Sequence, residues 1–177
     1  MLFLRAVDNR KHVHAVFFQT MVLVLSLSAV VLAELKPGTR APSFREKDVN
    51  GRVVDSKQLS ADAMLLDFWS TWAKPCETAM PQWESLHRKY RGKGLVVIGV
   101  AMDEDPKLVA PYLKKRSISY EVLLDAHGKV SDSYSVREQP TTYLIDRQGI
   151  IRYVYPGYKP GLEKTVEQNV LLMLKRK

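Results

Sequence analysis

Residues 69–81 read WSTWAKPCETAMP, and the pattern around this stretch decides the fold. A short apolar run at residues 63–68 (AMLLDF) leads into it and indicates a buried strand. Apolar residues follow with helical spacing over residues 76–91, and the run at residues 95–102 (LVVIGVAM) lacks polar alternation, as in a strand buried on both faces. A strand, a helix and a strand in this order imply a parallel pair with a right-handed crossover.

Strands and helices continue on both sides of this unit. Asp105 and Pro106 predict the start of a helix that runs to about residue 116, with Pro111 kinking it or delaying its start. Before the central stretch, an Asn-Gly turn within residues 48–54 predicts a small β-hairpin. The other predicted elements are a strand at residues 121–125, a hairpin of residues 141–146 and 150–155 around a glycine-containing turn, and an amphipathic helix at residues 160–174.

In their order and spacing, these motifs resemble the extracytoplasmic thioredoxin-like family of thiol-disulfide oxidoreductases often called TlpA/ResA-like, which is related to the redoxin group. The matching pieces are APSF with DVNGRVV, LLDFWSTWAKPCETAMPQW, VIGVAMDEDP and VREQPTTYLIDRQGIIRYVYPG, and the resemblance spans residues 41–177. It implies an α/β domain of thioredoxin-like fold over residues 34–177. A central mixed sheet flanked by helices, with an N-terminal β-hairpin extension, is therefore the predicted fold class.

The thiol chemistry of that family depends on two cysteines, and this sequence has one, Cys76. No intramolecular disulfide can form. In the family, an accessible thiolate at a helix N-terminus attacks the substrate disulfide, and a second thiol resolves the mixed disulfide. The resemblance places Ala73 at the attacking position and Cys76 at the resolving position. The CxxC motif is therefore degenerate, and we expect no complete dithiol-disulfide cycle from this chain alone.

Proton transfer around the motif depends on acidic residues. Asp67, six residues before Ala73, matches the buried acid by which thioredoxins shuttle protons to the resolving thiol, so Cys76 and Asp67 are the candidate catalytic residues. The alternative interpretations are an inert buried cysteine and a strand-end aspartate with a structural hydrogen bond. Related sequences commonly carry a glutamate where this chain has Ala79. Glu77 is a poor substitute, because it lies about 200° around the helix from Ala79.

The resemblance also implies a groove for an extended peptide, formed by residues around Pro140. Pro140, within the context PTTYLID, matches the family's cis-proline, which faces the cysteine motif and exposes the backbone of Gln139 for strand-like pairing. Glu138 replaces a glycine that is common at this position. Trp69 and Trp72 fit the family's WxxW pattern, as a core and a groove residue respectively. The candidate substrate-binding residues are therefore Trp72, Gln139 and Pro140.

Three functions remain open from the sequence. A binding module would hold an extended peptide, as a chaperone or assembly factor for cysteine-containing exported proteins. A single-thiol oxidoreductase would form mixed disulfides through Cys76 that a partner thiol resolves. A peroxidase would use Cys76 against peroxides, but peroxiredoxins need a hydroxyl residue at the position of Ala73 and an arginine where Pro140 stands. The four histidines show no metal-ligand spacing, so no metal and no other cofactor are expected.

The first 33 residues carry an export signature. Three basic residues precede 19 uncharged residues at positions 15–33, which end in Val-Leu-Ala, as before a signal-peptidase site. The same stretch is long enough to span a hydrocarbon core about 30 Å thick. Residues 1–33 are therefore expected to be either a signal peptide or an N-terminal membrane anchor. Both routes place the domain outside the cytoplasm, in the periplasm or at the outer face of the cytoplasmic membrane, soluble or anchored.

The net charge of +8 does not point to nucleic acid. Residues 1–33 hold three basic and one acidic side chain, so a net charge of +6 remains without them. The basic residues are scattered, with no interleaving of basic and aromatic residues on one element. We therefore interpret the charge as a solvated surface and expect no nucleic-acid partner.

Overall fold

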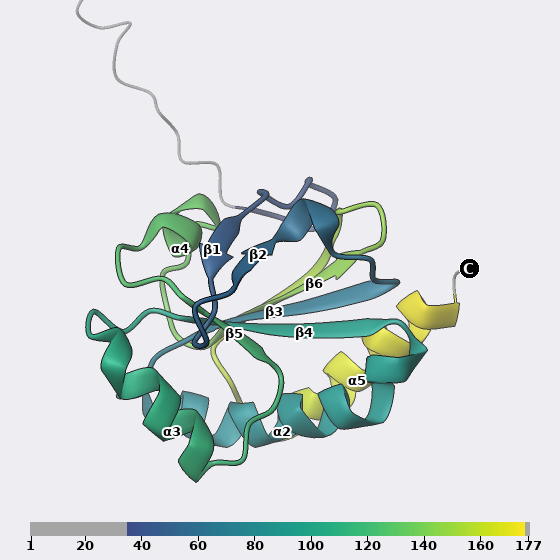
Figure 1. Ribbon diagram of the computed structural model, residues 1–177. Coiled ribbons are helices and arrows are strands. Elements are labelled where there is room, and N and C mark those ends of the chain that lie inside the picture. The colour runs from purple at the N-terminus through teal and green to yellow at the C-terminus, as the bar shows by residue number, and fades with distance from the viewer. Residues whose placement is uncertain (1–34, 176–177) are drawn as a thin grey trace, which may run out of the picture. The chain divides into compact units, whose positions relative to one another are not determined.

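A five-stranded mixed sheet forms the centre of the computed structural model, which describes residues 35–175 (Figure 1). In its middle, β3 (Ala63–Trp69) pairs in parallel with β4 (Leu95–Ala101) and antiparallel with β6 (Thr141–Asp146). The two edges are β5 (Glu121–Leu124), parallel to β4, and β7 (Ile151–Pro156), antiparallel to β6. The predicted mixed sheet is confirmed.

The predicted signal peptide or membrane anchor, residues 1–33, lies outside the described residues. Within residues 35–175, no helix is long and apolar enough to cross a membrane.

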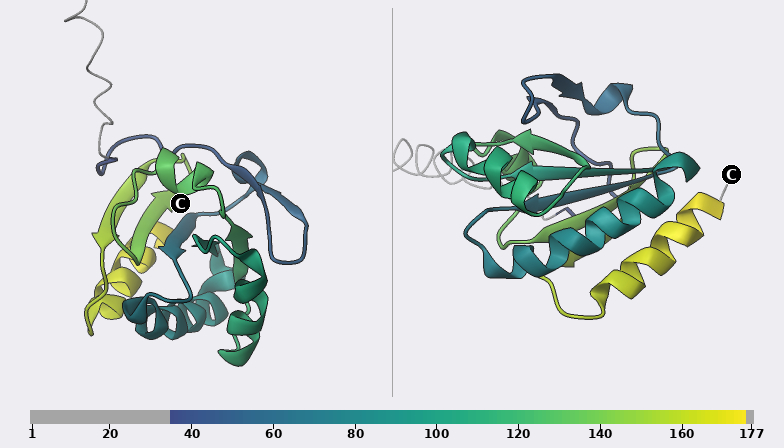
Figure 2. Two further views of the ribbon diagram at one scale, coloured as in Figure 1. Left: turned by 90° about the vertical axis from the view of Figure 1, so that its left-hand side faces the viewer. Right: turned by 60° about the horizontal axis from the view of Figure 1, so that its bottom comes forward.

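Three helices cover one face of the sheet (Figures 1 and 2). They are α2 (Lys74–Tyr90), which continues into the short η2 (Arg91–Lys93), α3 (Val109–Lys115) and α5 (Leu162–Lys175). Their apolar side chains form one hydrophobic cluster with Leu65 of β3. This cluster underlies the whole length of α2, so the start of α2 is held firmly against the end of β3.

The opposite face of the sheet is covered by smaller elements. These are α4 (Lys129–Ser133) and a separate hairpin of β1 (Arg45–Lys47) and β2 (Val53–Asp55), followed by η1 (Ser56–Gln58). Side chains alternate along a strand, so Leu66 faces this second cluster while its neighbour in β3 faces the first. Short covering elements leave part of this face open.

Asp48 organises the N-terminal hairpin. It has no exposed surface, and its carboxylate accepts the backbone N–H groups of Asn50 at 2.9 Å and Arg52 at 2.7 Å. The backbone N–H of Val49 donates to the carbonyl of Val122 at 3.0 Å, which attaches the hairpin to the edge strand β5. The hairpin predicted from the Asn-Gly turn is confirmed.

The predicted helix at residues 105–116 is divided into two parts. A 3₁₀ turn, η3 (Pro106–Leu108), comes first and α3 follows it. Asp105 caps the turn by accepting a backbone N–H at 3.0 Å. Pro111 is the third residue of α3, where backbone N–H groups have no partner inside the helix. Pro111 thus falls in the first turn of α3, where it removes no hydrogen bond within the helix.

The sequence did not predict α4. Its first turn is capped from a distance, because the carboxylate of Asp125 accepts the N–H groups of Val130 at 2.9 Å and Ser131 at 2.8 Å. Gly128, with φ 69°, turns the chain between the cap and the helix. Helix-start patterns place the capping residue directly before the first turn, so this longer connection gave no recognisable signal.

Candidate functional site

The site forms where β3 ends and α2 begins. Trp69, the last residue of β3, is fully buried and stacks on Tyr112 with ring centroids 5.4 Å apart. Trp72 is 72% exposed. The helix α2 starts at Lys74, and Ala73 is its N-cap residue without a side-chain hydrogen bond. The two tryptophans thus lie as predicted, one in the core and one on the surface beside the helix start.

Cys76 lies in the first turn of α2 and has no exposed surface. Burial above all raises the pKa of its thiol to about 12. A backbone hydrogen bond from Ser70 acts in the opposite direction, whereas the carboxylates of Asp67 and Asp103 raise the pKa further. Because the charged groups that act on this thiol are negative, the site stabilises the neutral form.

Asp67 is fully buried in the middle of the sheet. The register of β3 and β6 places Thr142 opposite Asp67, and the Thr142 hydroxyl donates to one carboxylate oxygen at 2.7 Å. The other carboxylate oxygen has no hydrogen-bond partner among the described residues. Burial raises the pKa of Asp67 to about 7, against the opposing effects of Thr142 and the Trp83 indole. The Trp83 N–H itself lies outside hydrogen-bonding geometry.

Asp103 is a site residue that the sequence reasoning missed. It follows β4, is 3% exposed, and accepts the backbone N–H of Thr71 at 3.1 and 3.2 Å and the Thr71 hydroxyl at 2.5 Å. These hydrogen bonds hold the loop between β3 and α2 against the end of β4. The available signal was an acidic residue shortly after the buried parallel strand β4. It lies at the carboxyl end of this strand, as the motif lies at the carboxyl end of β3.

A surface groove runs beside the start of α2. Its volume is about 380 Å³, and its walls come from the motif, from the residue after β4 and from the loop before β6. Gln139 donates its side-chain amide to the sulfur of Met102 at 3.2 Å, and its side-chain oxygen has no partner among the described residues. The peptide bond between Gln139 and Pro140 is cis. The groove is lined by Trp72, Ala73, Lys74, Pro75, Met102, Val136, Arg137, Glu138 and Gln139.

The structure thus separates the predicted site residues into two groups. Cys76 and Asp67 lie in the interior and Trp72 and Gln139 line the groove, whereas Pro140 is buried and does not line it. Their functional roles remain predictions. Among residues 35–175, no three His, Cys, Asp or Glu side chains are grouped so that they could hold a metal ion.

A family model described as the AhpC/TSA family matches residues 37–154. The chain belongs to the AhpC/TSA family. The thiol-disulfide oxidoreductase ResA of a Bacillus cereus strain is 35% identical over 116 residues, which cover 66% of this chain and 67% of that protein. The protein of the same name from Bacillus subtilis (strain 168) is 29% identical over 123 residues, covering 70% of this chain and 69% of the relative.

Solved structures show the same fold for this AhpC/TSA family member. A thiol:disulfide interchange protein of the thioredoxin family from Chlorobium tepidum TLS superposes with a TM-score of 0.69 at 26% identity, covering 80% of this chain and 99% of that chain. The thioredoxin domain of a thiol-disulfide oxidoreductase from Bacteroides vulgatus has a TM-score of 0.67 at 23% identity, covering 77% of this chain and 99% of that domain. At this identity, the similarity supports the fold and nothing about function. The thioredoxin-like fold and the redoxin relationship predicted from the sequence are confirmed.

Proposed function

We propose that this chain is an exported thioredoxin-fold protein that binds extended, cysteine-containing polypeptides but does not run a dithiol-disulfide cycle alone. One observation carries the proposal. Ala73 occupies the N-terminal end of α2, where the resemblance places the attacking thiol, and the one thiol present, Cys76, has no exposed surface. The groove beside this helix end is open, although the chemistry next to it is incomplete.

Disulfide exchange requires an accessible thiolate that attacks one sulfur of the substrate while the other sulfur leaves as a thiolate. The pKa of Cys76 is raised to about 12. At pH 7, about one thiol in 10⁵ would be ionised at such a pKa. Burial blocks the approach of a substrate sulfur as well. Cys76 therefore suits a packing role better than a nucleophilic one.

The two alternatives that use Cys76 are correspondingly less favoured. A single-thiol oxidoreductase needs a reactive Cys76, yet Asp67 and Asp103 both oppose thiolate formation. A peroxidase needs hydroxyl and guanidinium groups near the thiol, and Ala73 and Pro140 stand at the corresponding positions. Both alternatives require Cys76 to react in the folded protein, so alkylation of Cys76 in the folded protein tests them.

Peptide binding fits the groove without any thiol. Trp72 is 72% exposed and lines it together with the apolar side chains of Pro75, Met102 and Val136. Exposed aromatic side chains beside a groove are frequent anchors of protein contacts. The resemblance assigns strand-like pairing with a peptide to the backbone of Gln139, which precedes the cis bond to Pro140. The partner would be an extended segment of an exported protein, and a partner thiol could act on that segment while it is held.

Export is supported by the pattern of residues 1–33, in which basic residues precede 19 uncharged ones. We propose that this segment directs residues 34–177 to the periplasm or to the outer face of the cytoplasmic membrane. Fractionation of cells that produce the full chain, with a protease added to intact spheroplasts, tests this. A chain that stays protected in the cytoplasm would contradict it.

The decisive experiment restores the missing thiol. We expect Ala73→Cys to gain the ability to reduce a model disulfide such as insulin with dithiothreitol as electron donor, whereas the unchanged chain stays at the uncatalysed rate. The control is Ala73→Cys combined with Cys76→Ser, which should lose the gain because no second thiol resolves the mixed disulfide. Catalysis by the unchanged chain would overturn the proposed lack of a dithiol cycle.

Peptide binding is tested separately by titrating an unfolded, cysteine-containing peptide in a calorimeter. Binding should be the same for Cys76→Ser and the unchanged chain, and about tenfold weaker for Trp72→Ala, because the exposed ring is the proposed anchor. Equal affinity of Trp72→Ala and the unchanged chain would remove the groove from the proposal.

A further inference from the structure

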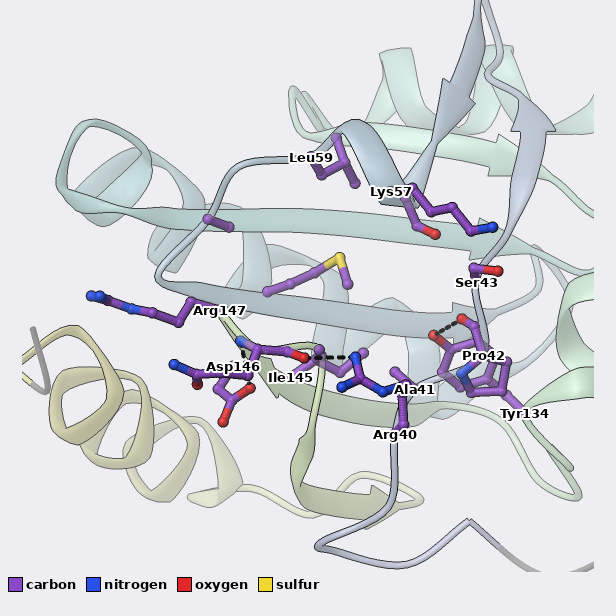
Figure 3. Close-up of a pocket in the computed structure, with 15 residues that line it drawn as sticks. Arg40, Ala41, Pro42, Ser43, Lys57, Leu59, Tyr134, Ile145, Asp146 and Arg147 are labelled. Atoms are coloured by element: carbon purple, nitrogen blue, oxygen red, sulfur yellow. Dashed lines mark hydrogen bonds between the residues drawn. The ribbon is translucent and has the colours of Figure 1, made fainter.

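A second pocket lies far from the groove. It has a volume of about 480 Å³ and is shown in Figure 3. Met64, the second residue of β3, contributes to it from the sheet face that carries α4 and the hairpin. The thiol motif begins after the other end of β3, roughly 20 Å further along a strand of this length. The pocket is thus separate from the site around Cys76, and a function here goes beyond the proposed function.

We propose that this pocket binds a small organic anion with an apolar body and one negatively charged group, such as an aliphatic or aromatic carboxylate. The pocket combines an apolar floor with a cationic rim. Its volume lies within the range of roughly 300 to 1,000 Å³ that is common for small-molecule sites.

The floor of the pocket is apolar and firmly held. Ile145 is 1% exposed, and Tyr134 is fully buried with its hydroxyl donating to the carbonyl of Pro42 at 2.8 Å. Leu59 and Met64 are only partly buried against this cluster, so their side chains have apolar surface to offer. The floor exists because the hairpin and α4 together leave this part of the sheet face uncovered. An apolar ligand body would bury that surface.

Two cations from different segments form the rim. Arg40 precedes the hairpin, whereas Lys57 belongs to η1 on the other side of the pocket (Figure 3). Both are exposed, and neither forms an ion pair within residues 35–175. A third cation, Arg147, is already paired with Asp62 at 2.8 Å and points away from the pocket in Figure 3. Arg40 and Lys57 are thus available to an anion.

Arg40 is held in place before any ligand arrives. One of its guanidinium nitrogens donates to the carbonyl of Gln148 at 2.9 Å. That nitrogen lies 3.4 Å from where a Cβ of Gly149 would be, so the glycine, with φ 73°, lets the guanidinium lie close to the turn. The other N–H groups of the guanidinium remain free for an anionic group, and a preplaced donor loses less entropy on binding.

The acidic residue in the wall does not cancel this positive rim. Asp146 lines the pocket, and its carboxylate accepts the N–H groups of Gln148 and Ile150, each at 2.9 Å, and forms an ion pair with Arg152 at 2.5 Å. Its charge and its acceptor capacity are thus used inside the turn between β6 and β7. Charge complementarity therefore selects an anion over a neutral or cationic ligand of the same shape.

The test uses octanoate as the probe and the complete protein as isolated from its host. Two-dimensional NMR spectra should show saturable shifts of the amides of Lys57 and of residues 147–150, and no shifts at Trp72 or Cys76. Octanol, with the same chain and no charge, and acetate, with the charge and no chain, should each bind at least tenfold more weakly, because the ligand needs both parts.

Two pairs of variants locate the binding. Lys57→Gln should weaken octanoate binding about tenfold by removing a charge-assisted hydrogen bond, whereas Lys164→Gln, which removes an exposed charge from α5, should not change it. Ser43→Glu places a carboxylate in the pocket rim and should also weaken binding, whereas Ser43→Gln should not. All of the substituted positions are exposed, so folding is not at risk.

Three results would overturn the proposal. Octanol or acetate binding as tightly as octanoate would mean that the rim or the floor takes no part. Unchanged affinity in Lys57→Gln would place the anion elsewhere. Binding of the protein to vesicles with anionic phosphatidylglycerol but not to octanoate would mean that this face contacts a membrane surface and is not a small-molecule site.

Discussion

Two ionisable side chains in the interior, Cys76 and Asp67, both favour their neutral forms. Neither has exposed surface, and burial raises their pKa values to about 12 and about 7. The unpartnered oxygen of Asp67 makes its ionised form costly, because no donor replaces the lost hydration. An acid with a pKa near 7 beside a thiol would suit proton transfer, but the attacking thiol that would use it is replaced by Ala73. The pair therefore bears on stability more than on catalysis in this chain.

Alkylation of Cys76 should require unfolding. Because the thiol has no exposed surface and a pKa raised to about 12, we expect iodoacetamide to leave the folded protein unlabelled at pH 7 and to label it fully in urea. Mass spectrometry reads the added mass, with Cys76→Ser as the blank. Rapid labelling of the folded protein at pH 7 would instead favour a single-thiol oxidoreductase.

Asp67→Asn should flatten the dependence of stability on pH. The pKa of Asp67 is about 7 in the folded protein against an ordinary value of 3.8, so the folded state binds this proton more tightly than the unfolded chain does. The contribution of Asp67 to stability is therefore complete below about pH 4 and falls as the pH rises towards 7. At 1.36 kcal/mol for each pKa unit, the fall is of the order of 4 kcal/mol.

Urea denaturation at pH 4, 5.5 and 8 measures this effect. As the pH rises from 4 to 8, the stability of Asp67→Asn should increase relative to that of the unchanged chain. A constant difference between the two would show that Asp67 ionises as easily in the folded protein as in the unfolded chain.

At the scale of elements, one carboxylate connects α2 to the loop before β5. Glu84 is 6% exposed and accepts the Ser119 backbone N–H at 2.7 Å and the Ser119 hydroxyl at 2.6 Å. It also pairs with Arg88 at 2.5 Å. Burial alone would raise the pKa of Glu84, but these hydrogen bonds outweigh burial and the pKa is lowered. The ionised carboxylate thus stabilises the packing of α2, which positions the start of this helix at the groove.

Glu84→Gln should lower the free energy of unfolding by about 2 kcal/mol at pH 7, because hydrogen bonds to a charged acceptor become weaker neutral ones. Since the folded pKa is lowered, the stabilisation is present above the ordinary value of 4.5 and is lost as the pH falls through the folded value. The matched control is Glu77→Gln on the same helix. Glu77 is half exposed in its ion pair with Arg116, so the change should cost less than about 1 kcal/mol. Equal costs for the two variants at pH 7 would contradict the argument.

At the scale of the whole molecule, the helices and strands were predictable because their signals are local, and the family resemblance then implied the fold that joins them. The runs that form α2, β4 and the β6–β7 hairpin carry their own periodicity, and their predicted ends agree with the structure to within two residues. What could not be predicted depends on partners distant in sequence. The hydrogen bond from Thr142 to Asp67 follows from the register of β3 and β6, and Asp103 reaches the motif loop across the end of the sheet. The pocket beside Arg40 is likewise assembled from several segments.

Within residues 35–175, one hydrophobic cluster lies on each face of the sheet, and residues 34–177 form one compact unit. We therefore expect residues 34–177 to fold alone, with one cooperative urea transition and the same midpoint as the longer chain. The sharper comparison is residues 42–177, which lack the segment that pairs with the start of β7. That segment forms three backbone hydrogen bonds, from Gly38 to Ile151 at 2.8 Å, from Ile151 to Thr39 at 2.9 Å and from Ala41 to Gly149 at 2.8 Å.

Losing these three bonds should lower the free energy of unfolding by about 2 to 4 kcal/mol, at a net value of about 1 kcal/mol for each bond. The shorter fragment should also lose octanoate binding, because Arg40 is absent and the turn at residues 147–150 loses a neighbour. Circular dichroism in urea measures the stability, and NMR measures the ligand. If residues 42–177 were as stable as residues 34–177, the N-terminal segment would not belong to the folded unit, and Arg40 would have no fixed place at the rim of the pocket.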